Sequence, residues 1–482
     1  MRMNKLAAVH CAAAMMGTNV PAMAVTTPMT VCAEVITSGT CGADLTWKFS
    51  VEDGTLTISG TGPMEEYSGT DAPWYDWLGN VKKIVVQDGV TSIGNLTFVY
   101  YYELTEISLP DTLVELGYGA FAQCNQLTTV KLPASLERIG SRLYIPDAID
   151  TFLPSSPFIG CAALTDVEVD ADNPNFVSVD GILYSKDMKT LFCYPSGKDE
   201  DSYTVPDGVT TISSSAISSN SFLEQLTFPE GLEMLDINAV ESLDHIKTVS
   251  IPASVTMLDN NFAGCTHLSA IEVAKDNTVY TSVDGVLYSK DMTVLYNYPA
   301  GKSGKSYEIP DGVTTIFDTA CEGTKLVTVT VPASVTTVRY GAFKNCNKLK
   351  DITFLNPNCE VELFSSTIYN GWSNELGAFS YSGTIHGYEG STVQKYAEEC
   401  GYKFEAISET APTDPPAAAV MGDLDGSGAV DIMDVIKINK SVLGTDKLAE
   451  EQQKLADINK DGKVDSADAL LLLKLALGMQ IE

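Results

Sequence analysis

The sequence is poor in histidine and in positive charge. Its 482 residues include four histidines and four tryptophans, and 30 basic side chains stand against 63 acidic ones. The net charge of -33 repels phosphate backbones and anionic lipid surfaces, so nucleic acid is not an expected partner. No later stretch approaches the roughly 18 continuous apolar residues of a membrane span. The composition therefore favours a secreted protein or a binder of cations.

Recognisable catalytic motifs are also missing. The sequence contains no HExxH zinc motif, no G-x-S-x-G nucleophile turn and no phosphate-binding glycine loop. His245, His267 and His386 lie outside the N-terminal segment, and none of them has metal-ligand spacing. We therefore predict no catalytic residues. A glycosidase needs only two carboxylates, which leave no motif, so hydrolase activity stays the alternative hypothesis.

The N-terminal segment has the features of a secretory signal peptide. A basic tip precedes a short apolar stretch, and Ala22-Met23-Ala24 offers small residues for cleavage. His10 interrupts the apolar stretch, which keeps a disordered cytosolic N-terminus as the alternative. The bulk of His10 also disfavours a lipid anchor on Cys11. We expect residues 1–24 to be a signal peptide and the mature protein to be secreted.

The middle of the chain is built from repeats of about 23 residues with an L-x-x-I-x-L core. Four segments share an apolar phrase around a cysteine: AFAQCNQL (120–127), PFIGCAAL (157–164), NFAGCTHL (261–268) and AFKNCNKL (342–349). Such a period predicts a β-rich leucine-rich-repeat solenoid, in which each turn buries its apolar face by stacking on its neighbours. In one repeat the residues expected to point inward are Leu104, Ile107, Leu109, Leu116, Phe121 and Cys124.

The cysteine of each of these four segments occupies the equivalent position in its repeat. Other repeats put Tyr101, Asn220 or Leu243 there, and a disulfide partner would not tolerate that exchange. Free, buried thiols are therefore predicted at Cys124, Cys161, Cys265 and Cys346. If the protein has a disulfide, we expect it between Cys32 and Cys41.

A second repeat overlays the first. The phrase VDGILYSKDMKTLFCYPSG from Val179 returns in similar form from Val283, which predicts decorating hairpins that turn at Lys186-Asp187 and Lys290-Asp291. Their matched aromatic residues could form a binding stripe, but packing onto the solenoid edge is the preferred interpretation. These residues are Tyr184, Tyr194, Tyr288 and Tyr298.

The pattern divides the chain into four parts after the signal peptide. An N-terminal β cap is predicted over 25–83, and the solenoid over 84–407 ends in a cap with a short helix. A Pro/Ala/Thr linker follows at 408–420, and a last domain covers 421–482.

One face of the predicted sheet is polar and small. Leucine-rich alternation turns these residues outward: Glu106, Ser108, Thr129, Lys131, Asp166, Glu168, Gln225, Thr227, Thr248, Ser250, Glu272, Thr328, Thr330, Asp351 and Thr353. None is aromatic, so the face is either a weak, polar binding site or simply solvated. Exposed aromatic candidates lie instead at Trp74, Tyr75, Trp77 and Tyr100–Tyr102, although a cap would bury several of them.

The IP-x-x-V-x-x-I and AF-x-x-C phrases resemble the BspA-like leucine-rich-repeat proteins of bacterial surfaces, over residues 41–407. The resemblance implies a surface-exposed or secreted protein that binds proteins, host surfaces or other cells. The ligand of the solenoid remains an unknown protein or surface.

Two acidic, glycine-centred phrases, GDLDGSGAVDIMD and ADINKDGKVDSAD, stand near the end of the chain. A calcium loop of 12 residues supplies oxygens from positions 1, 3, 5, 7, 9 and 12 around a glycine at position 6. The first loop offers Asp423, Asp425, Ser427, the Ala429 carbonyl, Asp431 and Asp434, and the second offers Asp457, Asn459, Asp461, the Lys463 carbonyl, Asp465 and Asp468. Gly428 and Gly462 stand at the turns, and Asp replaces the usual Glu at position 12. Two Ca²⁺ ions are predicted; acidic turns that merely begin helices are the alternative.

One short helix is predicted after each loop, at 435–443 and 469–477, and a glycine (Gly444 or Gly478) ends each. This duplication resembles a type I dockerin over 421–482, a small all-α calcium module that binds the cohesins of cellulosome scaffolds. The resemblance assigns cohesin contacts to Ile432, Met433, Asn439, Lys440, Ser466, Ala467, Leu473 and Lys474. We therefore expect a secreted, non-catalytic binding protein attached to a cohesin in a polysaccharide-degrading system. The alternative is a cellulosome-associated enzyme.

Overall fold

The computed structural model describes residues 37–67, 70–143, 151–258, 260–362, 367–373, 378–407, 422, 424, 430, 432–444, 447–448, 450–459 and 462–476. The chain divides into two compact units, Met1–Ala406 and Ile407–Glu482, and each is described by itself. The predicted signal peptide and linker lie outside the described residues, so their boundaries stay predictions.

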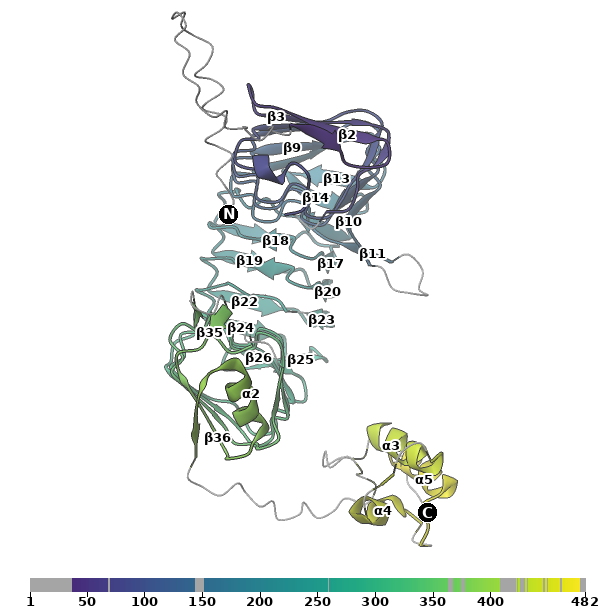
Figure 1. Ribbon diagram of the computed structural model, residues 1–482, viewed down its shortest axis with the longest axis vertical. Helices are drawn as coiled ribbons and strands as arrows, with labels where there is room; N and C mark the ends of the chain where they lie inside the picture. The colour runs from purple at the N-terminus through teal and green to yellow at the C-terminus, as the bar shows by residue number, and fades with distance from the viewer. Residues whose placement is uncertain are drawn as a thin grey trace, which may run out of the picture. The chain divides into compact units, whose positions relative to one another are not determined.

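The first unit is a β-solenoid (Figure 1). Ile84 lies beside Ile107 in a parallel pair, so one turn advances about 23 residues, as the repeat predicts. The first strand of each turn belongs to what we call the outer ladder: β2 (Leu45–Ser50), β3 (Thr55–Gly60), β5 (Lys83–Val86), β7 (Glu106–Ser108), β9 (Thr129–Leu132), β12 (Asp166–Val169), β16 (Ser202–Thr204), β19 (Gln225–Thr227), β22 (Thr248–Ile251), β24 (Ala270–Val273), β28 (Ser306–Glu308), β30 (Thr328–Val331), β32 (Asp351–Phe354), β36 (Thr384–Gly387) and β37 (Lys403–Ala406).

A second ladder runs along another side of the solenoid. Its strands are β4 (Gly62–Pro63), β6 (Val90–Ile93), β8 (Glu115–Gly117), β10 (Arg138–Leu143), β11 (Thr151–Pro154), β15 (Thr190–Cys193), β17 (Thr211–Ile212), β20 (Met234–Leu235), β23 (Met257–Leu258), β27 (Val294–Asn297), β29 (Thr315–Ile316), β31 (Thr337–Val338) and β33 (Glu360–Val361). Short pairs add β18 (Ile217–Ser218) with β21 (Val240–Glu241), and β34 (Gly371–Ser373) with β35 (Ala378–Ser380).

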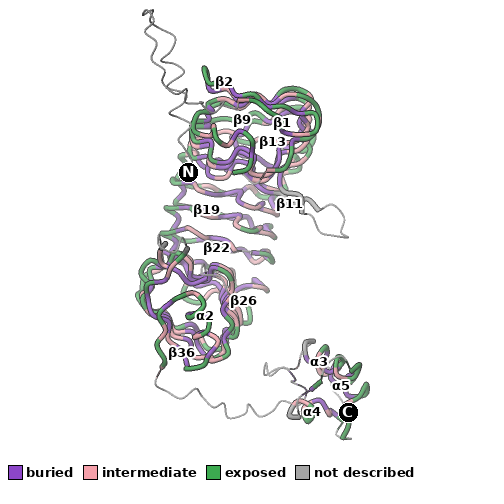
Figure 2. Tube along the Cα trace, in the orientation of Figure 1, coloured by how far each residue is buried: buried purple, intermediate pink, exposed green. Residues whose placement is uncertain are grey.

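Side chains along the outer ladder alternate between core and solvent. In β22 the side chains of Val249 and Ile251 are buried, whereas Thr248 and Ser250 are exposed (Figure 2). The period of two is what a strand with one buried face requires. The residues predicted to face outward on this ladder are all exposed or half-buried, which confirms the predicted orientation.

The repeated phenylalanines and cysteines fill the interior. Phe98, Phe121 and Phe158 stack one turn above another, with ring centroids 5.3 and 6.0 Å apart. The thiol of Cys161 donates to the carbonyl oxygen of Phe121 at 3.0 Å. Burial raises the pKa of the Cys265 thiol to about 12, which keeps the sulfur protonated at neutral pH.

The thiol prediction is confirmed, because the four repeated cysteines are free and buried. Tyr101, Asn220 and Leu243 are buried at the equivalent places. Cys41 is a free, fully buried thiol, and Cys32 lies outside the described residues.

The two predicted hairpins turn where expected but are not decorations. Each belongs to a three-stranded meander, one of β13 (Phe176–Val179), β14 (Ile182–Ser185) and β15, the other of β25 (Tyr280–Val283), β26 (Val286–Ser289) and β27. Because β15 pairs in parallel with β17, the meander continues the second ladder. Tyr184, Tyr194, Tyr288 and Tyr298 are at most 4% exposed, so they pack within the core and form no binding stripe.

Caps close both ends of the solenoid. At the N-terminal end β1 (Ser38–Thr40), β2 and β3 extend the first sheet, and the Trp74 ring before the short helix η1 (Tyr75–Trp77) stacks on Phe98 at 5.4 Å. At the other end lies the predicted helix, α2 (Thr392–Cys400), between β36 and β37. Ser391 accepts a hydrogen bond from the Gln394 amide at its start, and Gly401 (φ 70°) ends it.

The second unit is helical, with α3 (Ile432–Val442), α4 (Glu450–Ala456) and α5 (Ser466–Ala476). Helices α3 and α5 each begin three residues before the predicted starts, and α4 was not predicted. Their shared core consists of Leu424, Val435, Ile438, Leu448, Ala456, Ile458, Ala469 and Leu472. No described helix is long and apolar enough to cross a membrane.

Candidate calcium loops and binding surfaces

The second acidic loop connects α4 to α5. Its first predicted ligand, Asp457, directly follows α4, and its Oδ2 accepts a hydrogen bond from the Gly462 amide at 2.9 Å. Gly462 has φ 85°, the left-handed conformation that glycine adopts without strain, so the glycine at position 6 makes the turn as predicted. This contact wraps the loop around the carboxylate of position 1.

The Asp468 carboxylate, at position 12, joins three parts of the same loop. The side chain is 0% exposed, its Oδ1 accepts from the Asn459 amide at 3.1 Å and its Oδ2 from the Asp465 amide at 3.0 Å. Hydrogen bonds therefore connect Asn459, Asp465 and Asp468, which are positions 3, 9 and 12 of the loop. A carboxylate buried in so small a domain requires compensation; two loop amides provide part of it, and a cation bound in the loop would add to it.

The first loop repeats the central feature of the second. Asp434, also at position 12, is 0% exposed, and its Oδ1 accepts from the Leu424 amide at 2.7 Å. The remaining predicted ligands of this loop, and Asp461 of the second, lie outside the described residues: Asp423, Asp425, Ser427, Ala429 and Asp431. Lys463, whose carbonyl was predicted to bind, is exposed.

The described donors fit a hard cation. Asp457, Asn459, Asp465 and Asp468 offer oxygen atoms, which is the ligand type calcium prefers. Half of the predicted ligands lie outside the described residues, and among the described ones no group of three or more His, Cys, Asp or Glu side chains is placed to hold a metal ion. The assignment of two ions stays a prediction.

The residues predicted to contact cohesin lie near the starts and along the outer faces of α3 and α5. Asn439, Lys440, Ser466 and Ala467 are exposed. Leu473 and Lys474 are half-buried. Ile432 and Met433 open α3, but their side chains lie outside the described residues.

The same helices also expose apolar side chains that the sequence pattern did not predict, and Val442 at the end of α3 is 37% exposed. Ile436 is 41% and Leu470 is 55% exposed, whereas Leu472 is fully buried in the core between α3 and α5. The run Leu470–Leu473 carries the signal for this, because a helix that rotates 100° per residue cannot point four successive side chains into one core.

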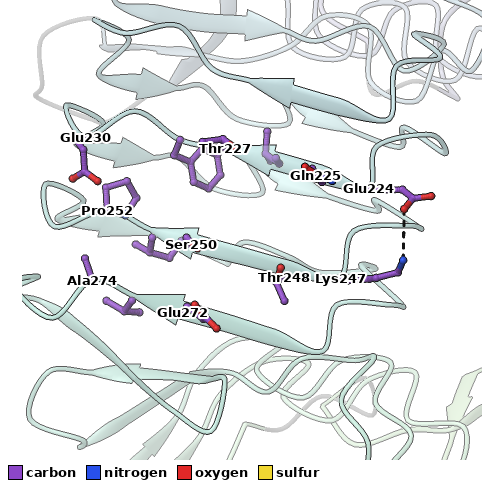
Figure 3. A pocket seen from close by; sticks show the side chains of 14 residues that line it. Glu224, Gln225, Thr227, Glu230, Lys247, Thr248, Ser250, Pro252, Glu272 and Ala274 are labelled. Atoms are coloured by element: carbon purple, nitrogen blue, oxygen red, sulfur yellow. Dashed lines mark ion pairs between the residues drawn. The ribbon is translucent and has the colours of Figure 1, made fainter.

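The outer ladder is hollowed over β19, β22 and β24, where a groove of about 690 Å³ lies (Figure 3). Small polar side chains, among them Thr227, Thr248 and Ser250, line it together with Glu230 and Glu272. At one end Glu224 pairs with Lys247 at 3.5 Å. The groove therefore suits a polar ligand that donates hydrogen bonds or carries positive charge.

At the far end of the outer ladder His386 lies between two carboxylates. Its Nε2 is 3.0 Å from Asp351 Oδ1, and its Nδ1 is 4.0 Å from Glu405 Oε2. Glu405 also pairs with Lys403 at 2.7 Å, and this contact, with the neighbouring His386, holds the pKa of Glu405 below its usual range.

Two family profiles match the sequence. The one described as BspA type leucine rich repeat region matches in six copies over residues 73–156, 192–291 and 297–382, which is more than half of the chain. The dockerin type I domain matches residues 421–475. No curated protein matches the chain.

Solved leucine-rich-repeat structures resemble the chain at low identity. A protein from Eubacterium ventriosum is 24% identical, with a TM-score of 0.39 over 65% of this chain and 90% of that one. A leucine rich cell surface protein from Faecalibacterium prausnitzii is 18% identical, with a TM-score of 0.36 over 67% and 95%. The pneumococcal vaccine antigen PcpA is 16% identical, with a TM-score of 0.32 over 77% and 98%. At these scores none of them carries a functional argument.

Proposed function

Because this chain belongs to the BspA-type leucine-rich-repeat family and also carries a type I dockerin domain, we propose that it is a secreted, non-catalytic binding protein of a polysaccharide-degrading cellulosome. The dockerin implies binding to a cohesin, and the solenoid is a binding scaffold. The observation that carries the proposal is the tail itself, in which both loops bury the carboxylate of position 12 against loop amides.

In this proposal each loop of the tail holds one calcium ion. The first ion would be bound by Asp423, Asp425, Ser427, the Ala429 carbonyl, Asp431 and Asp434, and the second by Asp457, Asn459, Asp461, the Lys463 carbonyl, Asp465 and Asp468. A bound ion supplies the positive charge that lets these carboxylates lie close together, and so holds α3 and α5 in place for a partner.

The cohesin would contact the starts and outer faces of α3 and α5. The proposed contacts are Ile432, Met433, Asn439, Lys440, Ser466, Ala467, Leu473 and Lys474. To these the exposed side chains of Ile436 and Leu470 are added, because apolar groups in the centre of an interface contribute most of the affinity.

The large share of the chain that the repeats occupy supports a non-catalytic role. The repeats occupy most of the first unit, and neither a leucine-rich solenoid nor a dockerin is a catalytic domain. The groove over β19, β22 and β24 is a hollow with accessible hydrogen-bonding groups and offers the solenoid one place for a polar ligand.

Calorimetry of the full chain with a recombinant type I cohesin tests the attachment. We expect binding with calcium and none in excess EDTA, and loss of binding in Asp468→Ala. Binding that is equally strong in EDTA would contradict the calcium-dependent dockerin.

The other two parts of the proposal have separate tests. N-terminal sequencing of the protein from culture medium should begin at Val25, which establishes export. Reducing-sugar and peptide-release assays on the same protein should detect no turnover. Turnover that disappears on replacing one solenoid carboxylate would establish the alternative, a cellulosome-associated enzyme.

A further inference from the structure

Two neighbouring tyrosines of the first unit present their rings to solvent. Tyr100 and Tyr102 are 42% and 43% exposed, with ring centroids 5.9 Å apart and an interplanar angle of 38°. Tyr101 between them is 1% exposed, and its hydroxyl donates to the carbonyl oxygen of Trp74 at 3.4 Å. The buried ring anchors the segment, so the two outer rings are held in place before any ligand binds.

The backbone of Tyr100 is strained. Its φ of 70° lies in the left-handed region, which a bulky side chain adopts only at a cost. The seven equivalent positions in other repeats have the same conformation but carry smaller or more polar residues. They are Gln123, Gly160, Ser219, Ser242, Gly264, Gly323 and Asn345. The fold therefore does not require an aromatic residue at this position. The tyrosine at position 100 is better explained by a function than by folding.

The surroundings of the pair are polar, and the exposed Lys82 of the preceding turn lies beside Thr105. The Tyr100 amide donates to the Ala122 carbonyl at 2.9 Å, so the next turn lies beside it with Gln123 and Asn125. The Oδ1 of Asn125 is buried and has no hydrogen-bond partner among the described residues. Glu103 is exposed next to Tyr102, and residues 96–130 contain no Lys, Arg or His.

The size of the patch argues against a protein partner. Within the described part of residues 37–140, Val51 is the one other large apolar side chain that is exposed. Protein interfaces need about 20 to 30 residues a side around an apolar centre. A sugar ring needs less, because its C–H face packs on the negative face of one aromatic ring and its hydroxyl groups bond to nearby amides and carboxylates.

We propose that Tyr100 and Tyr102 form a stacking site for the neutral sugar rings of a polysaccharide, with the exposed Glu103 carboxylate available to its hydroxyl groups. The carboxylate of Glu103 beside Tyr102 disfavours uronic-acid polymers. This site deepens the proposed function, on which it rests, by naming a ligand class for the solenoid.

Affinity electrophoresis of the full chain in gels containing xylan, mixed-linkage β-glucan or galactomannan tests the site, and polygalacturonate is the anionic probe. We expect at least one neutral polymer to retard the protein and polygalacturonate to leave it unretarded. Tyr100→Asn and Tyr102→Asn introduce the residues found at equivalent places, Asn345 and Asn125, so both variants should fold. Each should weaken retardation at least tenfold.

The matched control is Ser219→Asn, which places asparagine at an equivalent left-handed position several turns away and should keep wild-type retardation. The melting temperature of Tyr100→Asn should equal or exceed that of the wild type, because asparagine tolerates the left-handed conformation. Absence of retardation by every neutral polymer, or unchanged retardation in both tyrosine variants, would overturn the proposal. Calcium-dependent cohesin binding by the same variants distinguishes this failure from failure of the proposed attachment.

Discussion

Two acidic side chains, Asp468 in the tail and Glu241 in the solenoid, differ in how their negative charge is compensated. The carboxylate of Asp468 accepts two loop amides, whereas Glu241 in the solenoid has its pKa raised, first by burial and also by the nearby Glu322. Lys344 pairs directly with Glu322 at 2.9 Å and so compensates Glu241 only in part. Asp468 is suited to a cation, and Glu241 is the less compensated charge.

Glu241→Gln should stabilise the solenoid at neutral pH. Because the pKa of Glu241 is higher in the folded than in the unfolded chain, its contribution to stability is largest at low pH and is lost as pH rises through the folded pKa. Scanning calorimetry should therefore show a higher melting temperature for the variant at pH 8, and a smaller difference at pH 5.5. A difference that grows toward pH 5.5 would contradict the assignment.

Because the cysteines are buried, we expect a thiol reagent to label them slowly. Of the nine described cysteines eight are buried and Cys400 is half-buried, and all nine are free. Burial raises the pKa of the Cys346 thiol to about 11, so little reactive thiolate exists at pH 8. Among these nine cysteines, Cys400 should label first in the native protein, and the buried thiols only after unfolding. Mass spectrometry of labelled peptides checks this, and early labelling at Cys124 would count against it.

At the scale of elements, the loops and helices of the tail depend on each other. Among the described residues of the second unit eight buried apolar side chains form the core, and a core of this size gives a short chain little stability. The position-12 carboxylates lie at the first turns of α3 and α5 and bind loop amides. Calcium should therefore contribute folding free energy to this unit directly.

Chelation should unfold the tail and leave the solenoid intact. Calorimetry of the full chain in calcium should show a transition for each unit, and excess EDTA should remove the one that Asp468→Ala also removes. The helical signal in circular dichroism should fall with it. If both transitions survive EDTA unchanged, the calcium assignment is wrong.

The two helix starts should contribute unequally to cohesin binding. Ile432 and Met433 are bulky and apolar where Ser466 and Ala467 are small, so two docking orientations related by a half-turn would bury different groups. Losing a large apolar anchor commonly costs more than the roughly 1.4 kcal/mol that makes a tenfold preference. Ile432→Asp with Met433→Asp should therefore reduce cohesin affinity at least tenfold, and Ser466→Asp with Ala467→Asp much less.

Calorimetry compares the two double variants, with calcium-induced folding of each as the control. Equal, small losses would mean that the orientations interchange and that the difference between the helix starts has no effect on docking.

At the scale of the whole molecule, the two compact units have separate cores. The solenoid buries its apolar residues within Met1–Ala406, and the tail within Ile407–Glu482. A polar linker predicted at 408–420 joins them in sequence. The binding scaffold and the attachment module can therefore fold and function independently.

Limited proteolysis should cleave first within 408–420 and release two folded fragments. Each fragment should keep the melting temperature that its unit has in the intact chain, within about 2 °C, because each unit has its own core. A loss of about 1 kcal/mol in stability would shift the melting temperature by about 2 °C or more. A marked drop for either fragment would reveal a stabilising interface between the units.

By itself the sequence determined the solenoid, the buried place of Cys124 and its equivalents, and the two acidic loops with Gly462 at the turn. A repeat presents the same local environment many times, so its period and its variable places reveal which side chains point inward. The predicted ligands of the second loop lie within 12 residues, so their spacing alone is enough to predict a calcium loop.

Only the tertiary structure decided which aromatic rings are exposed. Trp74 and Tyr101 are buried because the cap and the first turn close over them, while Tyr100 and Tyr102, in the same short segment, face solvent. The hairpin tyrosines are likewise buried because their meanders join the second ladder. The helix α4 was missed because a seven-residue helix has little stability of its own and forms by packing Ala456 into the shared core. Exposure of a ring depends on the turns stacked against it, which no single segment of sequence contains.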